Sequence, residues 1–214
     1  MRYGGEMARQ SLSTYINIKK LHRPIFTTHE LASLSGRSLS STVHTLNVLE
    51  REGFIFKIYR GVWAESGDER LSPNAVIPYL FPRHRAYVSF VSALHLYGII
   101  GQIPQMVTLA STVHTRIIRT KIGVFSVHRI APSFFNGFGW YRGTGSFLIA
   151  GMEKALVDSL YLSARSKKRQ FGYFPELHFP RSFSFKKARE WAKKIPDAKI
   201  RSYVQKRLAA LINA

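Results

Sequence analysis

The chain has 214 residues, and 45% of them are hydrophobic, so it is long and apolar enough to bury a core. Its 32 Lys and Arg outnumber 12 Asp and Glu, giving a formal net charge of +20. This excess favours a polyanion, most simply nucleic acid. An anionic membrane surface is the rival partner, but the charge is spread along the chain and not gathered beside an apolar anchor. The absence of cysteine excludes disulfides, thiolate metal sites and thiol catalysis.

The N-terminal segment contains no apolar signal core. The most apolar stretch, residues 87–104, is interrupted by His, Ser, Gly and Pro and makes a poor membrane span. We therefore expect no membrane partner and a cytoplasmic location.

Residues 11–63 are predicted to form a winged helix-turn-helix. A first helix over 11–21 offers Leu12, Tyr15, Ile16 and Ile18 as core candidates. A capping box, Thr27-x-x-Glu30, then begins a second helix, in which Leu31 and Leu34 share one face and Ala32 suits a close helix crossing. Gly36 follows in the position where helices commonly end in a left-handed conformation.

The next helix carries the sharper prediction. At about 100° per residue, its inward face is expected to hold Leu39, Val43 and Leu46, with Leu49 at the border. Its outward face would be made of small hydroxyl residues and one histidine, with a cation just ahead, and these are the candidate DNA contacts: Arg37, Ser38, Ser40, Ser41, His44 and Thr45. The alternative is a helix-turn-helix that serves only packing or protein contact.

A β-hairpin is predicted directly after this helix. Phe54, Phe56 and Ile58 alternate as a half-buried strand would, residues 59–61 form the turn, and Val62 begins the return strand. Two cations near the tip complete the candidate DNA-binding residues: Lys57 and Arg60. The alternative is a hairpin whose cations are only solvated.

The polar stretch 65–70 suggests a domain boundary, so domains are expected at 1–68 and 69–164. Helices over 74–80, 89–97 and 152–162 and strands over 106–110, 116–118, 124–130 and 146–149 make the second domain α+β. No acidic residue lies between Glu69 and Glu153. The candidates for a second basic surface in this span are Arg83, Arg85, Arg116, Arg119, Lys121 and Arg129; chance clustering in a basic protein is the alternative.

Residues 165–214 are predicted to form a basic linker and a helical extension, with helices over 184–194 and 198–213. Their inward faces would be Phe185, Ala188, Trp191 and Ala192, then Ile200, Val204, Leu208 and Leu211. Their cationic faces favour nucleic-acid contact or simple solvation equally.

No catalytic pattern stands out. Lys154 and Asp158, four residues apart, predict a helix salt bridge, and the carboxylates of Glu153 and Asp158 do not share a helix face. The histidines lack metal-ligand spacing, and the glycines of residues 137–145 lack the Lys-Ser/Thr of a phosphate loop. We expect no enzyme, no metal and no cofactor.

Three stretches together resemble the AbiEi family of bacterial type IV antitoxins: LEREGFIFKIYRGVWA (49–64), YVSFVSALHLYGIIGQIP (87–104) and IAGMEKALVDSLYL (149–162). The resemblance covers roughly residues 11–163. It implies a winged domain that binds inverted repeats in operator DNA and represses its own operon. It also implies an α+β domain that antagonises a nucleotidyltransferase toxin without a stable complex. By this resemblance the DNA role falls on Arg37, Ser40, Ser41, His44, Thr45 and Arg60, and the protein would be bacterial and nucleoid-associated when bound. An RNA-binding module that uses the basic second domain is the alternative function.

Overall fold

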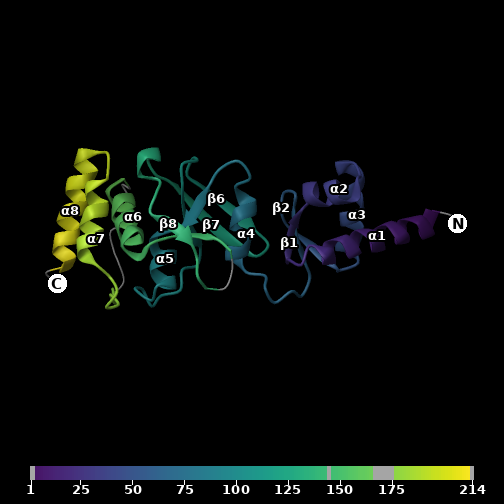
Figure 1. Cartoon of the computed structure of the whole chain (residues 1–214), viewed down its shortest axis with the longest axis horizontal. Coiled ribbons are helices and arrows are strands. Elements are labelled where there is room, and N and C mark those ends of the chain that lie inside the picture. The colour runs from purple at the N-terminus through teal and green to yellow at the C-terminus, as the bar shows by residue number, and fades with distance from the viewer. Residues whose placement is uncertain (1–2, 144–145, 166–175, 213–214) are drawn as a thin grey trace. The chain divides into compact units, whose positions relative to one another are not determined.

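The computed structural model describes residues 3–143, 146–165 and 176–212, which divide into two compact units. The first unit holds the described residues up to Leu80 together with Thr120–Ile122, and the second holds the remainder (Figure 1). The chain is mixed α+β, as predicted, with one three-stranded and one six-stranded sheet. The domain limits predicted at residues 68 and 164 stay predictions.

The first unit combines helices with a small antiparallel sheet. Its elements are α1 (Tyr3–Lys20), β1 (Ile25–Thr27), α2 (Thr28–Ser35), α3 (Leu39–Arg51), β2 (Ile55–Tyr59), β3 (Val62–Glu65) and α4 (Pro73–Leu80). The strand order is β1-β3-β2, so the hairpin β2–β3 follows α3 directly and β3 is central. One core cluster joins the helices to this sheet: Ile18, Phe26, Leu31, Leu46, Leu49, Ile55 and Trp63.

The start and end of α2 are as the sequence predicts. The Thr27 hydroxyl accepts a hydrogen bond from the Glu30 amide, and the Glu30 carboxylate accepts one from the Thr27 amide, which completes the capping box. Gly36 ends the helix in the left-handed region, at φ 61°. Leu34, however, is exposed, although it was expected beside Leu31 on the inward face.

The predicted inward faces of α1 and α3 are right only in part. Ile18, Leu46 and Leu49 are in the core as predicted, and Tyr15 packs against it. On α1, Leu12 and Ile16 are exposed, while Ser11, Thr14 and Ile18 lie inward. On α3, Leu39 and Val43 are exposed, and the buried residues are Thr42, Thr45, Leu46 and Leu49.

The physical reason on α3 is the hydrogen bonding of its threonines. The Thr42 hydroxyl donates to the Ser38 carbonyl at 2.9 Å, and the Thr45 hydroxyl donates to the Ser41 carbonyl at 3.2 Å. With the hydroxyl satisfied inside the helix, the threonine methyl can face the core. The buried stripe keeps Leu46 and Leu49 and is turned by roughly 60–70° from the one that leucine and valine alone predict.

The alternation expected in β2 is right only for Ile58. Ile55 and Ile58 are buried, whereas Phe54 is exposed and Phe56 half-buried. The register between β2 and β3 shifts between Lys57 and Tyr59, so an irregularity of the β-bulge kind interrupts the period of two.

The second unit is built on a mixed sheet of order β6-β7-β5-β4-β9-β8. Its strands are β4 (Ala86–Val88), β5 (Val107–Ser111), β6 (Arg116–Thr120), β7 (Gly123–Arg129), β8 (Phe138–Trp140) and β9 (Leu148–Ala150). The pairs β5–β7 and β4–β9 are parallel, whereas β4–β5 and β8–β9 are antiparallel. Its helices are α5 (Phe90–Leu96), the 3-10 turn η1 (Pro132–Phe134), α6 (Met152–Arg165), α7 (Phe185–Lys193) and α8 (Ala198–Ile212).

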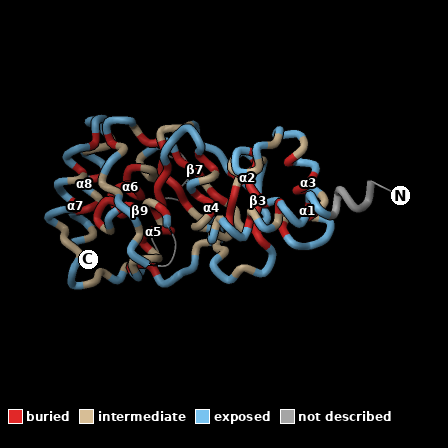
Figure 2. The backbone as a smooth tube through the Cα atoms, turned by 45° about the vertical axis from the view of Figure 1, so that its right-hand side comes forward, coloured by how far each residue is buried: buried red, intermediate tan, exposed pale blue. Residues whose placement is uncertain are grey.

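Helix α6 lies at the centre of this unit. It packs against α5 and against the α7–α8 pair (Figure 1). Every residue of α6 from Glu153 to Tyr161 is buried, which the burial-coloured tube shows as a continuous red segment (Figure 2). Ala188, Ala192, Val204 and Leu208 of α7 and α8 are buried, as predicted, while the other expected inward residues of these helices are only half-buried.

Most of the predicted basic linker lies outside the described residues, which resume at Glu176. In the part of the chain that the structure describes, no helix is long and apolar enough to cross a membrane.

Candidate nucleic-acid interface

The N-terminus of α3 is capped and held by hydrogen bonds. The Ser38 side chain accepts a hydrogen bond from the Ser41 amide at 3.2 Å and so serves as the helix cap. Arg37, just ahead, is half-buried and donates to the Ser41 hydroxyl at 2.7 Å, the Gln10 side chain at 3.0 Å and the Thr45 hydroxyl at 3.4 Å. Arg37 therefore ties α1 to α3 and is not a freely extended cation.

The sequence-predicted residues of α3 divide into two groups. Ser40 and His44 are exposed, as predicted. Ser41 is half-buried beneath the Arg37 guanidinium, and Thr45 is 3% exposed, so the expectation that Thr45 points outward is wrong. Its position on the stripe of Thr42, Leu46 and Leu49 turns it into the core.

The outward face of α3 contains residues that the sequence analysis missed. The exposed positions recur at the spacing of one helix face: Ser40, Val43, His44, Asn47 and Arg51. Val43 was expected inside, and Asn47 and Arg51 were not considered. The hydroxyl-rich pattern at Thr42 and Thr45 is the signal that could have corrected the phase, because threonine tolerates burial inside a helix when it bonds the preceding turn.

The β2–β3 hairpin, which follows α3 directly, adds two exposed cations, Lys57 and Arg60. Arg60 lies in the turn before Gly61, whose φ of 71° suits glycine. The Lys57 amide donates to the Glu50 carboxylate at 2.9 Å, and this hydrogen bond lowers the pKa of Glu50. The Lys57 ammonium lies 5.4 Å from the Trp63 ring centroid.

The hairpin is anchored to α2 by a buried contact. The Trp63 indole N–H donates to the Thr28 hydroxyl at 3.0 Å, and the Thr28 amide donates to the Gly61 carbonyl at 3.0 Å. The start of the return strand is thus fixed to the beginning of α2 by two contacts, one at the turn and one in the core.

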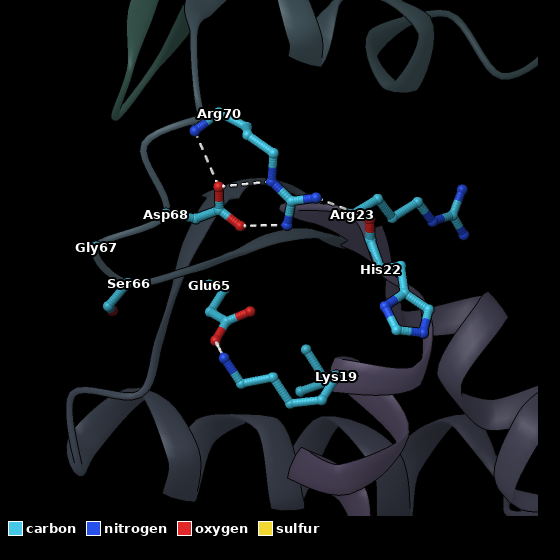
Figure 3. Close-up of a pocket in the computed structure, with 9 residues that line it drawn as sticks. Lys19, His22, Arg23, Glu65, Ser66, Gly67, Asp68 and Arg70 are labelled. Atoms are coloured by element: carbon cyan, nitrogen blue, oxygen red, sulfur yellow. Dashed lines mark hydrogen bonds and ion pairs between the residues drawn. The ribbon is translucent and has the colours of Figure 1, made fainter.

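A polar cavity of about 320 Å³ lies at the C-terminal end of α1 (Figure 3). Its charged groups pair with one another: Lys19 with Glu65, and Arg70 with Asp68 at 2.7 Å. The side-chain hydrogen bond from Arg70 lowers the pKa of Asp68. Arg70 also donates to the His22 carbonyl at 2.9 Å. These pairs fasten the segment after β3 to α1 and leave little uncompensated charge for a ligand.

The structure brings together three of the six residues that were predicted to form a second basic surface. Ala86 pairs with Ser111, Ser111 with Arg129, and the Arg129 amide donates to the Thr115 hydroxyl. This register places Arg85, Arg116 and Arg129 at one end of the six-stranded sheet, all exposed. Arg83 is exposed in the segment before β4, and Arg119 is exposed further along β6. Lys121 belongs to the first unit, where it pairs with Glu50 at 3.1 Å.

No group of three or more potential metal ligands occurs within the described ranges. A scan against protein-family models found no match to this chain, and neither did a comparison with curated proteins.

Proposed function

We propose that this chain is a sequence-specific DNA-binding repressor whose first unit acts as a winged helix-turn-helix. The observation that carries the proposal is the exposed face of α3, free of acidic side chains and followed directly by a hairpin with Lys57 and Arg60 exposed. The element order, with α2 and α3 joined by a short turn and a β-hairpin after them, suits a helix that enters the major groove and a wing that meets the backbone.

Selection from a random duplex library, followed by anisotropy titration of the full chain at physiological salt, tests this function. We expect the selected duplex to bind at least 100-fold more tightly than a scrambled duplex, because specific sites commonly exceed non-specific DNA by 10³-fold or more. Equal affinity for the two duplexes would reject the proposal. If the operator consists of inverted repeats, the selected site will show two-fold symmetry.

An antitoxin role is a further part of the proposal, and it is supported by the resemblance of residues 149–162 to the AbiEi family. The α+β unit would oppose a nucleotidyltransferase toxin without forming a stable complex. Growth of cells expressing a toxin encoded beside the gene, with and without this chain, tests the role. Restored growth without co-purification is expected, and continued arrest would contradict it.

RNA binding by the second unit is the alternative function. The observation that favours it is the exposed set Arg85, Arg116 and Arg129 at one sheet end. Competition between the selected duplex and structured RNA distinguishes the two functions. Tighter binding to RNA, lost in the triple variant R85A/R116A/R129A, would favour this alternative.

A further inference from the structure

The outward face of α3 has a distinctive chemistry. Val43 is 37% exposed, and the exposed residue Asn47 lies one turn further along the same face. Among the described residues, the Asn47 carboxamide has no hydrogen-bond partner. An exposed valine and an amide side chain without a protein partner are therefore both available to a ligand at this spacing.

The two side chains match the major-groove edge of an A·T pair. A carboxamide can form two hydrogen bonds with adenine, to the N6 amino group and the N7 acceptor, whereas an apolar side chain packs on the thymine methyl. Val43 and Asn47 are separated by about 6 Å along the helix axis, which is roughly two base-pair steps.

The ends of the same face suit the phosphates. Ser40 and Arg51 lie about 16 Å apart along the helix and so bracket Val43 and Asn47 at the two ends of the face. Between them the exposed positions Val43, His44 and Asn47 include no arginine or lysine, the side chains that most often recognise guanine. Arg51 is the only Lys, Arg, Asp or Glu among the five exposed residues of this face. Its positive charge favours a nucleic acid over a protein helix as the partner that binds there.

We propose that α3 reads A·T base pairs, with Asn47 recognising adenine and Val43 the thymine methyl, while Ser40 and Arg51 contact phosphates. This inference rests on the proposed DNA-binding function and specifies which bases its helix recognises. His44 lies between Val43 and Asn47 and is not needed for the preference for A·T base pairs.

Base analogues in the selected duplex test each contact separately. Replacing thymine by uracil removes only the 5-methyl group, and replacing adenine by 7-deazaadenine removes only the N7 acceptor. For the full-length chain, each replacement at one defined position of the site should weaken binding 5- to 30-fold. In the variant Val43→Ser, which replaces the apolar side chain by a polar one, the uracil effect should vanish while the deazaadenine effect remains; Asn47→Ala should show the reverse.

Matched controls lie in the second unit, where Gln102 and Ile103 are exposed. Gln102→Ala and Ile103→Ala should keep both analogue effects, and urea unfolding should show all four variants folded. If the selected duplex binds specifically but both analogues act equally on wild type and variants, the A·T inference fails and the DNA-binding function stands. If no duplex is enriched over scrambled DNA, the proposed function itself fails.

Discussion

Lys154 and Asp158 form an ion pair in which neither side chain is exposed to solvent. The Asp158 carboxylate also accepts hydrogen bonds from the Ser89 hydroxyl at 2.7 Å and the Tyr87 hydroxyl at 3.1 Å. The Lys154 ammonium lies 3.8 Å from the Phe134 ring centroid. Burial lowers the pKa of Lys154 and raises that of Asp158, and the pairing of the two groups opposes both of these shifts.

Removing one member of this pair should be strongly destabilising. Lys154→Met keeps the aliphatic volume but leaves a buried carboxylate without its cation, which typically costs about 3–5 kcal/mol. Urea unfolding measures the loss. Glu190→Gln is the matched control, because it breaks the exposed Lys193–Glu190 pair and should change the free energy of unfolding little. Equal losses in the two variants would contradict the assignment of Lys154 as a core residue.

The stability of the protein should fall in mild acid because of His128. Burial lowers the pKa of His128 to about 4, whereas in the unfolded chain it stays near 6.5. Between these values the unfolded state binds more protons, so stability decreases as pH falls from 6.5 towards 4. From pH 7 to pH 5 the contribution is a loss of about 2 kcal/mol.

Urea unfolding at both pH values measures this dependence in wild type and in His128→Gln. The variant should lose about 2 kcal/mol less than wild type between pH 7 and pH 5. His114→Gln, at an exposed position of the same unit, serves as the control and should behave as wild type. An unchanged pH dependence in His128→Gln would contradict a neutral buried imidazole.

A side chain at position 36 should destabilise the protein because of the backbone conformation and not because of crowding. An added Cβ would meet no atom within 4 Å, yet φ of 61° disfavours an L-residue. Gly36→Ala should lower the free energy of unfolding by about 1–2 kcal/mol, as measured by urea titration. Gly101→Ala, at an equally open position without positive φ, should change it little. A comparable loss at Gly101 would show that local crowding, and not φ, decides the effect.

Arg60 should contact DNA phosphates and not base edges. Arg60→Ala is expected to weaken binding to selected and scrambled duplexes alike and to reduce the slope of log K against log salt by about 1. Titrations at several salt concentrations measure this slope. Lys186→Ala removes an exposed charge from α7 and should leave the slope unchanged. A selective loss for the selected duplex would instead assign Arg60 to base recognition.

Arg37 should behave as a positioning residue. Its hydrogen bonds to Gln10, Ser41 and Thr45 hold the start of α3, so Arg37→Met should lower the free energy of unfolding by about 1 kcal/mol or more. Binding to the selected duplex should weaken, but the salt slope should change by less than half of the Arg60→Ala change. A slope change as large as that of Arg60→Ala would show a direct phosphate contact.

The sequence predicted correctly those features that depend only on a few neighbouring residues. The capping box at Thr27 and the glycine end of α2 are confirmed because each is complete within a few residues. The i,i+4 pairing of Lys154 with Asp158 is confirmed for the same reason, but its full burial depends on α5 and on the α7–α8 pair around α6. The short strands β1, β4 and β8 were not predicted, since three residues carry no clear period and gain strand geometry from their partners.

The outward face of α3 was predicted only in part, since Ser40 and His44 are exposed as expected, whereas Thr45 is buried. A helical periodicity based on leucine and valine alone predicts that Val43 faces the core. In the structure Thr42 and Thr45 face the core instead, and Val43 is exposed. The prediction therefore included Thr45 and missed Asn47. The threonines at positions 42 and 45 carried the signal for the adopted phase, and packing across the unit selects it over the alternative.

The hydrogen bond from the Trp63 indole to the Thr28 hydroxyl has a thermodynamic consequence for any ligand of the first unit. It joins the hairpin to α2 before a ligand arrives, so the groups of α3 and of the hairpin tip are arranged in advance. Association then requires little ordering of the backbone, and the conformational entropy that it loses is confined to side chains such as Arg51 and Arg60. The heat-capacity change of complex formation would accordingly follow the apolar area covered, without the larger negative contribution of a segment that folds on contact.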